Sequence, residues 1–519
     1  MKSQSFTIRN NQMLVAQVRR ILQRLSLRSS GRRFRHRVSG YHVAVQSLEM
    51  RTLLTAGDLD PSFGIAGQVE TEFDNSDAWS RVAKASALQA DGKIVAAGEG
   101  ALVRYLPDGS LDVTFGNDGR VAFPYYATSI AVQANGRVVV TGQTDENSGT
   151  DFIVGRYLPN GSLDPSFDGD GWVVTDFGSD SESARGVAIQ ANGRIVVAGG
   201  SNDSIAVARY NVDGSLDSTF DTDGKFLRRF NTNYYDTAHA VTIQADGRIV
   251  VAGATWVSYS YNSSNRDFFV MRLNPGGALD RSFDGDGYLN INFSRGAVSH
   301  EEAHSLAIQS DGRIVVSGYA KVNFTSYLGL ARLNSDGSPD HSFDLDGIRL
   351  QAISSYPNNF EAGERTLIQP DGRIVTFARG KLYRFMTDGS PDTTFDQDGA
   401  AAFDGDVKTA LIQPDGRIVA GGTRHGLFSM MRLTAEGSRD LSFSVNGSVE
   451  TDMGPSIDVA GGSALQANGR IVVAGKSLRG FSFARYLPNG NLDPSFSQDG
   501  LTVINFGEPY FEAGATDVV

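Results

Sequence analysis

The chain has 519 residues, of which 40% are hydrophobic and 20% charged, and it contains 59 glycines and no cysteine. This composition excludes an intrinsically disordered protein, and the length exceeds that of one ordinary compact domain. The lack of cysteine excludes disulfides, thiolate zinc sites, iron–sulfur clusters and cysteine nucleophiles. No apolar run approaches the roughly 18 residues of a spanning helix, so we expect that the chain does not span a membrane.

The net charge of -12 combines a basic head with an acidic body. Residues 1–51 contain eleven Lys or Arg and one acid, Glu49, which gives +10 and leaves -22 for the remainder. Nonspecific affinity for DNA or RNA rests on accumulated contacts of Lys and Arg with phosphates. We therefore expect no nucleic-acid partner.

Residues 1–56 are predicted to form a basic N-terminal targeting or tail segment, partly helical or disordered. Within residues 11–27, apolar side chains recur at helical spacing with arginines between them, which predicts one amphipathic helix. Residues 29–40 form an arginine cluster without an apolar period, as in a solvated segment. Because arginines interrupt every apolar stretch, a conventional signal peptide is not indicated. A disordered tail that contacts anionic surfaces is the alternative.

A short motif ends this segment. Residues 48–54 read Leu-Glu-Met-Arg-Thr-Leu-Leu. This string resembles the LEPR-XLL type N-terminal motif of large exported or surface proteins in planctomycete bacteria, with Met50 where that family usually has proline. The resemblance implies export or residence at the cell surface, whereas the structural alternative is a linker that leads into the body.

The body, residues 57–519, consists of one repeat. The string LDxxFxxDG recurs nine times at spacings of 48 to 63 residues, and one QxxGRIV-like string lies between each pair. The aspartates of the first string are Asp60, Asp112, Asp164, Asp217, Asp280, Asp340, Asp392, Asp440 and Asp493. The paired strings resemble the delta-60 repeat family, whose repeats are taken to form a β-propeller. We therefore expect eight repeats and a partial ninth at the C-terminus.

One repeat is consistent with a propeller blade on physical grounds. Between Asp164 and Asp217, residues 170–177, 184–190, 194–200 and 204–211 each predict a short strand. Asn192 and Gly193 predict a tight hairpin turn because positive φ costs little at these residues. Four antiparallel strands without a helix, repeated eight times, predict an all-β fold: a β-propeller of about eight four-stranded blades. A β-solenoid is the alternative.

Closure of the ring involves both ends of the body. Residues 501–507 and 515–519 align with further strands beyond the eighth repeat. We expect C-terminal strands to complete the blade begun at the N-terminus, either displacing residues 67–73 or pairing with them.

Repeated Asp-x-Asp-Gly turns are the candidate metal site. Two interpretations are open: weak calcium binding, or turns in which aspartate caps the backbone and glycine supplies positive φ. A calcium loop needs about six to eight oxygens and a further bidentate acid, which this pattern lacks. No other cofactor is expected. The aspartates concerned are Asp168, Asp170, Asp221, Asp223, Asp284, Asp286, Asp344, Asp346, Asp396 and Asp398.

Catalytic patterns are few. Residues 300–304 read His-Glu-Glu-Ala-His, which satisfies the zincin pattern but precedes a predicted strand instead of lying on a helix. We interpret this string as a solvated polar loop, with metal binding as the alternative. No nucleophile elbow or phosphate-binding glycine loop occurs between a strand and a helix.

Variable loops are the candidate ligand surface. Strand alternation places the uniform Asp-Gly turns on one face and the loops of variable length on the other, where residues 255–267 and 319–327 account for the longest repeats. Aromatic side chains on loops of a rigid scaffold are typical of ligand surfaces, although they also serve to cover their own loops. The candidate contacts are Tyr234, Tyr235, Trp256, Tyr259, Tyr261, Tyr319, Phe324 and Tyr327.

These observations predict an exported or cell-surface binding or scaffolding module whose ligand is a polysaccharide, a cell-wall polymer or another surface protein. The alternative is a propeller-type carbohydrate-active hydrolase or lyase. Such an enzyme needs two carboxylates at about 5 to 9.5 Å across the substrate. The candidate acids near the variable loops are Glu301, Glu302, Glu361 and Glu364.

Overall fold

The computed structural model describes residues 70–72, 83–91, 93–98, 100–106, 112–116, 119–144, 149–230, 236–260, 263–294, 299–323, 325–353, 362–403, 405–425, 427–444, 446–451, 459–466, 468–477, 480–496 and 501–505. The chain divides into two compact units, Met1–Leu53 and Leu54–Val519, and every described residue belongs to the second. The predicted N-terminal segment, with its helix and its leucine-rich motif, lies outside the described residues. A search of the described residues finds no helix with the length and apolar character needed to cross a membrane.

The described residues form thirty-three β-strands and no helix, which confirms the predicted all-β fold. Strands β2 to β33 group into eight units of four consecutive antiparallel strands, which we call blades 1 to 8. Blades 1 to 4 comprise β2 (Ala83–Leu88), β3 (Ile94–Gly98), β4 (Gly100–Tyr105), β5 (Arg120–Phe123); β6 (Tyr126–Val132), β7 (Val138–Gln143), β8 (Phe152–Tyr157), β9 (Trp172–Thr175); β10 (Glu182–Ile189), β11 (Ile195–Ser201), β12 (Ser204–Tyr210), β13 (Lys225–Arg228); and β14 (Thr237–Ile243), β15 (Ile249–Ser260), β16 (Ser263–Leu273), β17 (Tyr288–Ile291).

Blades 5 to 8 continue the same pattern. They comprise β18 (Ser299–Ile308), β19 (Ile314–Val322), β20 (Thr325–Leu333), β21 (Ile348–Ala352); β22 (Ala362–Ile368), β23 (Ile374–Ala378), β24 (Lys381–Phe385), β25 (Ala400–Ala402); β26 (Asp406–Ile412), β27 (Ile418–Arg424), β28 (Leu427–Leu433), β29 (Ser448–Thr451); and β30 (Val459–Leu465), β31 (Ile471–Ser477), β32 (Gly480–Tyr486), β33 (Leu501–Asn505). A parallel bridge between Arg266 and His300 joins blades 4 and 5 into one continuous sheet.

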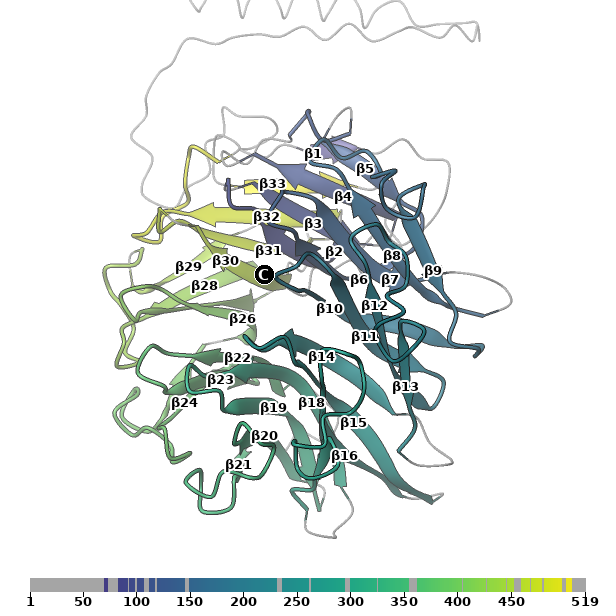
Figure 1. Cartoon of the computed structure of the whole chain (residues 1–519). Coiled ribbons are helices and arrows are strands. Elements are labelled where there is room, and N and C mark those ends of the chain that lie inside the picture. The colour runs from purple at the N-terminus through teal and green to yellow at the C-terminus, as the bar shows by residue number, and fades with distance from the viewer. Residues whose placement is uncertain are drawn as a thin grey trace, which may run out of the picture. The chain divides into compact units, whose positions relative to one another are not determined.

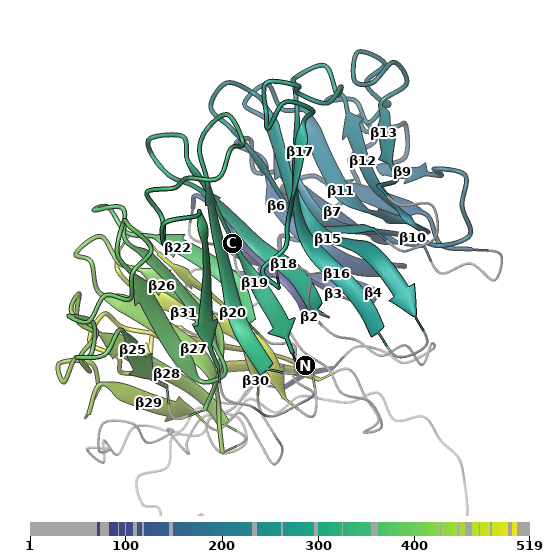
Figure 2. The same cartoon turned by 90° about the horizontal axis from the view of Figure 1, so that it is seen from below.

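The blades close into a ring. The first strand of each blade lies against the first strand of the next, from β2 and β6 through β26 and β30, and β30 lies against β2 again. Figures 1 and 2 show the sheets following one another, so that the first and last blades are neighbours. The short strand β1 (Glu70–Glu72) pairs in parallel with β33, Glu70 opposite Val503. The predicted contact between the two ends of the body is therefore a pairing and not a displacement.

One assignment within the repeat was wrong. Sequence reasoning placed residues 170–177 in the same sheet as 184–190, whereas β9 (Trp172–Thr175) pairs with β8 as the fourth strand of blade 2. The chain crosses to the next blade between β9 and β10, so the boundary between blades falls after the Asp-Gly turn. The alternation of strand direction is unaffected. The separation of uniform turns and variable loops onto opposite faces therefore stands.

The core lies between the blades. One cluster combines Phe152, Val154 and Phe167 of blade 2 with Ile195 and Tyr210 of blade 3, all fully buried. Strands β11 and β12 are buried on nearly every residue, because each sheet packs against a neighbour on both faces. This explains why the strands read as continuous apolar runs instead of alternating ones.

A repeated polar lock fixes each blade to the next on the face of the Asp-Gly turns. In blade 2, Asp164 Oδ2 accepts hydrogen bonds from Arg156 Nε at 2.8 Å and Arg137 Nε at 2.7 Å. Its Oδ1 accepts from the backbone N–H and hydroxyl of Ser166, as expected for an aspartate that caps its own loop. The Arg156 guanidinium lies 4.5 Å over the Phe167 ring and donates to the carbonyl of Val212 in the next blade.

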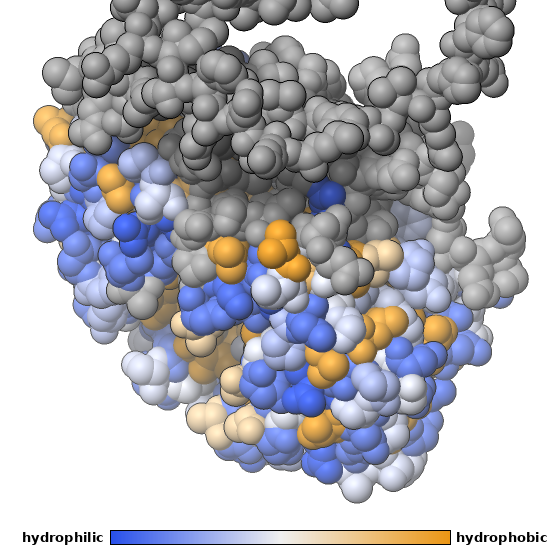
Figure 3. Space-filling model, turned by 90° about the horizontal axis from the view of Figure 1, so that it is seen from above, coloured by the Kyte–Doolittle hydropathy of each residue, from blue (hydrophilic) through white to orange (hydrophobic). Residues whose placement is uncertain are grey.

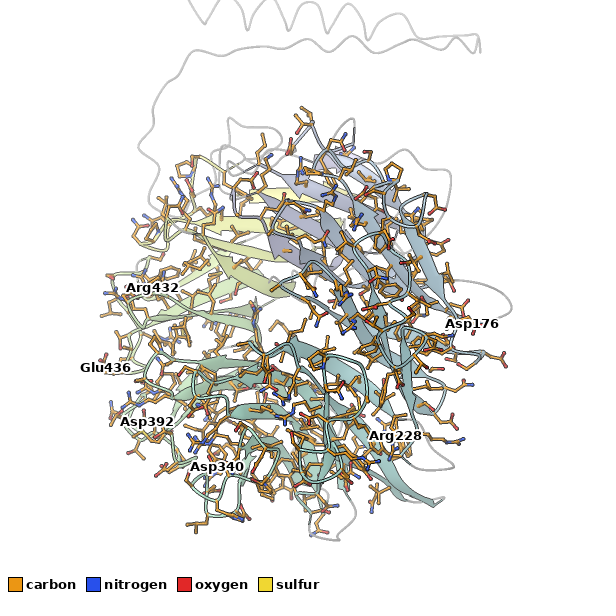
Figure 4. The ribbon with its side chains drawn as sticks, viewed as in Figure 1. Asp176, Arg228, Asp340, Asp392, Arg432 and Glu436 are labelled. Carbon is orange, nitrogen blue, oxygen red and sulfur yellow. The ribbon has the colours of Figure 1, made fainter. Side chains whose placement is uncertain are left out.

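The lock is present in all eight blades, with Arg Nε–Asp Oδ2 distances of 2.7 to 2.8 Å. The arginine–aspartate pairs are Arg104–Asp112, Arg156–Asp164, Arg209–Asp217, Arg272–Asp280, Arg332–Asp340, Arg384–Asp392, Arg432–Asp440 and Arg485–Asp493. Figure 4 labels Asp340, Asp392 and Arg432 on three successive blades at the periphery of the sheets. In blades 1 to 7 the lock arginine also donates to a backbone carbonyl of the next blade, so these paired side chains join neighbouring blades.

Candidate functional site

Every first strand contains a register shift five residues before the glutamine of the QxxGRIV string, a single-residue bulge except in blade 6, where the shift spans residues 363–365. In β10 the register shifts between Ala184 and Gly186, and in β14 between Ala238 and Ala240. A bulge inserts an extra residue and re-aims its side chain. The residues at this position are Lys84, Thr128, Arg185, His239, His304, Glu364, Lys408 and Gly461. The preceding residue is alanine in six of the eight blades and the following residue is small in most of them, so most of the chemical variation lies at the bulge.

Three neighbouring bulges bring an arginine and two histidines together. Arg185 Nη1 lies 3.4 Å from His239 Nδ1, and the rings of His239 and His304 meet edge to face at 5.7 Å. They line a pocket of about 480 Å³, which we call the Arg185 pocket, with Tyr126, Ala127, Thr128, Gln143 and Ser183. Arg185 remains exposed to solvent within this hollow.

A second pocket, of about 320 Å³, shares Ser183, Arg185 and His239 with the first and extends to Trp256. We call it the Trp256 pocket. Trp256 lies near the start of the extension of β15, in the longest hairpin of the described residues. The Arg266 guanidinium stacks 4.1 Å from the centre of the indole ring and pairs with Glu302. A cation on an aromatic face restrains both side chains.

The Arg185 pocket is lined by a cation and no acid, whereas the Trp256 pocket is lined by Arg185 and Arg266 together with Asp236 and Glu302. Burial lowers the pKa of Arg185, and burial together with the charge of Arg185 lowers the pKa of Arg266 to about 10. Burial and then the neighbouring cations lower the pKa of His239 well below its ordinary value. The same causes lower the pKa of His300 to about 4. His239 and His300 are therefore neutral at physiological pH, and the arginines provide the fixed positive charge.

The string His-Glu-Glu-Ala-His is a strand and not the predicted solvated loop. It lies in β18, where alternation places His300 and Glu302 on one face and Glu301 on the other. Glu302 Oε1 lies 3.1 Å from His300 Nε2, and its Oε2 lies 3.6 Å from His304 Nε2. With Arg266 also paired to it, Glu302 is the acid that anchors the cations of the Trp256 pocket.

Glu301 is excluded as a catalytic acid by its position. It is fully buried and accepts hydrogen bonds from the backbone N–H groups of Phe293 and Ser294. Glu182 and Asp236 do the same in blades 3 and 4, where each accepts the backbone N–H of the phenylalanine that follows the preceding blade. These acids cap the crossover between blades. Glu361 and the side chain of Glu364 lie outside the described residues.

The predicted aromatic contacts occupy different environments. Trp256 lines a pocket, whereas Tyr319 is 1% exposed and its hydroxyl lies 3.0 Å from Ser326 Oγ, so it belongs to the core and not to a surface patch. Tyr327 is half-buried against a core cluster. Tyr259 pairs with Ser264 in the hairpin, but its side chain is not described. Outside the described residues lie Tyr234, Tyr235, Tyr261 and Phe324.

The Asp-x-Asp-Gly turns make the bonds of structural turns. Asp168 has a φ of 52° and its N–H donates to the carbonyl of Asp213 in the next blade at 2.6 Å. Asp170 Oδ1 accepts the N–H of Trp172 at 2.9 Å. Each later turn repeats this pattern: the first aspartates (Asp221, Asp284, Asp344, Asp396) also have positive φ, and the second (Asp223, Asp286, Asp346, Asp398) also accept a backbone N–H.

Among the described residues, the group that brings three potential metal ligands together lies elsewhere. It consists of Asp151, Asp176 and Glu182, whose ligand atoms lie within 4.8 Å of one another. Glu182 already accepts bonds from Phe177 and Ser179. The calcium interpretation of the Asp-x-Asp-Gly turns stays a prediction.

Comparison with known proteins gives the class of the chain. Eight segments match the family described as "Domain of unknown function (DUF5122) beta-propeller": residues 89–115, 133–167, 190–220, 244–283, 309–343, 369–395, 413–443 and 466–496. One segment falls in each blade, so the chain is a β-propeller repeat protein that carries eight copies of this repeat.

No curated protein matches the chain. Similar solved structures include Sqt1 from Chaetomium thermophilum (12% identity, 73% of this chain and 86% of that chain, TM-score 0.45). Others are virginiamycin B lyase from Staphylococcus aureus (10% identity, 60% and 82%, TM-score 0.34) and the gluconolactonase XC5397 from Xanthomonas campestris (13% identity, 66% and 92%, TM-score 0.28). Similarity at this level carries no conclusion about the activity of this chain.

Proposed function

We propose that the propeller is an exported or cell-surface binding module for carbohydrate or cell-wall polymer, and that the ligand binds on the face of the variable loops. Export is supported by the resemblance of residues 48–54 to the LEPR-XLL motif, and the repeats resemble the delta-60 type. The observation that carries the proposal is the Trp256 pocket. It combines an aromatic face, a cation and a carboxylate at the base of the longest described hairpin.

This combination suits a sugar ring. A pyranose presents an apolar face that stacks on an indole and hydroxyl groups that bond to charged side chains. Trp256 is held in place by Arg266 and by its own backbone N–H, which donates to Asp236 Oδ1 at 3.1 Å. The pocket is therefore preorganised, which reduces the entropic cost of binding.

Apolar residues elsewhere on the described surface are isolated from one another. Figure 3 shows one face of the molecule, where hydrophobic residues among the described ones are scattered between hydrophilic neighbours. The most exposed large hydrophobic residues, Leu345 and Leu441, lie in separate Asp-Gly turn regions of blades 5 and 7. Isolated apolar residues of this kind are ordinary on a protein surface.

A binding module is favoured over a hydrolase or lyase by the roles of the described acids. Glycoside hydrolysis requires an acid and a base or nucleophile facing one substrate. Glu301 caps backbone groups, and Glu302 is paired with Arg266 and two histidines. A carboxylate held by a guanidinium is a poor proton donor near neutral pH because the cation favours its charged form.

The test is a binding screen of the full chain against neutral and acidic glycans and cell-wall polymers. We expect Trp256→Ala to weaken binding at least about tenfold, which corresponds to about 1.4 kcal/mol. Val257→Ala is the matched control, because Val257 is the next residue of the same strand, is exposed and does not line the pocket. Equal binding by the two variants would place the site elsewhere, and release of shortened glycans by the wild type would favour the enzyme.

A further inference from the structure

The Arg185 pocket has no carboxylate among its described lining residues. Its side chains are those of an arginine, two histidines, a tyrosine, a threonine, a glutamine and a serine, together with one alanine. The polar side chains other than the arginine both donate and accept hydrogen bonds, whereas the arginine only donates. With a fixed cation and no described acid, the pocket favours an acceptor, and a charged acceptor most of all.

Arg185 itself differs from the repeated arginines. Each lock arginine meets an aspartate of its own blade, as Arg209 meets Asp217. Within the described part of the chain, no carboxylate lies within 4.0 Å of the Arg185 guanidinium, and its one polar contact is His239 Nδ1. The guanidinium is exposed to solvent at a bulge that faces the pocket, so its N–H groups are available to a ligand. An external anion would supply the counter-charge that no described carboxylate provides.

His239 provides a second, independent observation. Its Nε2 atom is buried and makes no hydrogen bond with the described protein. Its other ring nitrogen faces Arg185 at 3.4 Å, and the His304 ring lies on the opposite side. A buried polar atom without a partner costs free energy unless a ligand or water satisfies it.

The neighbouring Trp256 pocket limits the kind of anion. Because the two pockets share Ser183, Arg185 and His239, a ligand anchored at Arg185 also reaches the indole. Free phosphate or sulfate would leave that aromatic face uncovered. A planar carboxylate attached to a sugar ring fits both parts, since the guanidinium fork binds carboxylates through two parallel bonds.

We propose that the Arg185 pocket binds the carboxylate of an acidic sugar, so that the carbohydrate recognised by this propeller contains uronic acid. The inference rests on the proposed function. The acidic body opposes long-range attraction of a polyanion. Recognition is therefore short-range and directed at a chain end or a short oligomer.

The experiment compares two ligands of the same shape by calorimetry on the full chain: trigalacturonate and its methyl ester. We expect the wild type to bind the acid at least about tenfold more tightly than the ester. Arg185→Gln should lose this preference, so that the acid and the ester bind with equal affinity. Arg185→Lys should recover only part of it, because an ammonium lacks the bidentate fork.

The matched control is Lys408→Gln. Lys408 occupies the equivalent bulge of blade 7, lines neither pocket, and loses the same charge on substitution. Its affinity for the acid should equal that of the wild type. An equal loss of affinity for the acid in Arg185→Gln and Lys408→Gln would show that only the net charge of the protein matters. This result would overturn the proposal.

The remaining outcomes separate the two proposals. If acid and ester bind equally, and both depend on Trp256, the carboxylate pocket is overturned while the carbohydrate module stands. If galacturonate binds in an Arg185-dependent way but no glycan in the screen does, the pocket stands and the module falls. Competition by inorganic sulfate or phosphate at equal concentration would assign the pocket to free anions and overturn the sugar assignment.

Discussion

The two faces of this propeller follow opposite rules. On the face of the Asp-Gly turns every blade repeats one arrangement, and the charges of Arg209, Asp217 and Arg194 satisfy one another. On the face of the variable loops, Arg185 and His239 stand at equivalent bulges with different chemistry and incomplete partners. Charged side chains that recur in every blade are thus paired within the protein. Side chains that differ between blades keep hydrogen-bonding groups that a ligand can satisfy.

This difference separates stability from recognition within one repeat. The uniform face connects each blade to the next, as where the N–H of Asp221 donates to the carbonyl of Gly276. Substitutions there should affect folding and leave binding specificity alone. Substitutions at the bulges should do the reverse.

The largest expected effect is acid unfolding of the uniform face. The pKa of the lock aspartate is lowered in all eight blades: burial raises it, but the bonds from the neighbouring Ser or Thr and the adjacent cations outweigh burial. A folded pKa below the unfolded value of about 3.9 gives stability that is present above that pH and lost as the pH falls through the folded pKa. Circular dichroism should show cooperative unfolding below about pH 4. An unchanged urea midpoint down to about pH 2 would contradict the paired state of these carboxylates.

Removal of one lock carboxylate is the next largest effect. Asp217→Ala leaves the buried Arg209 guanidinium without its acid, with side chains that are 3% and 2% exposed. Breaking a buried pair in this way costs about 3–5 kcal/mol, to be measured by urea denaturation. Asp213→Ala is the control, because the exposed carboxylate of Asp213 bonds only to Ser215 of its own turn and the substitution keeps the backbone carbonyl, so its loss should cost at most about 1 kcal/mol. Equal losses of unfolding free energy in the two variants would show that the Arg209–Asp217 pair does not stabilise the fold.

A smaller effect concerns the close approach of adjacent blades. Gly214 has a φ of +91°, and a Cβ there would lie 2.7 Å from the Asp168 nitrogen of the preceding blade. Gly193→Ala is the matched control, since Gly193 has a similar φ of +83° but would meet only a Val212 methyl at 3.3 Å. We expect about 1–2 kcal/mol for the control and a larger loss for Gly214→Ala. The same loss in both would mean that the blades relax apart freely.

The smallest expected effect concerns calcium at the Asp-x-Asp-Gly turns. Asp170 and its counterparts already accept backbone N–H groups, so few oxygens are left for a cation. A ligand far below its Kd contributes little through mass action, under about 0.5 kcal/mol. Differential scanning calorimetry with calcium and with chelator should therefore give the same Tm. A rise of several degrees in calcium that is lost in Asp168→Asn, Asp170→Asn would establish a calcium site.

Much of the fold was predictable because many residues of the repeat determine the local backbone, as the turn residues do. Asn192 and Gly193 form the predicted turn, with Gly193 at a φ of +83°. The phase of the blades was not predictable from one repeat, because β9 lies closer in sequence to β10 than to β8 and yet pairs with β8. Only the pairing with β8 decides between them.

The site was predictable in part. Trp256 was identified from its place in the longest insertion, whereas Tyr319 was misjudged because the insertion after it lengthens β19 and β20 and leaves the ring inside. The Arg185 pocket was missed. Its signal was present: one position, five residues before each glutamine, changes from lysine to threonine, arginine, histidine and glutamate, while most of its neighbours are small.

The lock arginines were also missed, although a cation in fixed register within an apolar strand requires a buried acid. Arg156 and Arg209 lie inside β8 and β12 and are 1% and 2% exposed. Eight such arginines each stand eight residues before one of the nine aspartates of the LDxxF string. This constant spacing was the available signal for their pairing.

Hydrogen exchange of the full chain with and without trigalacturonate tests the division between the two faces most directly. We predict that trigalacturonate slows amide exchange in the peptides that contain Arg185, His239 and Trp256. Exchange in the Asp-Gly turns of all eight blades should be unchanged. Protection at the Asp-Gly turns, or uniform protection around the ring, would contradict this prediction.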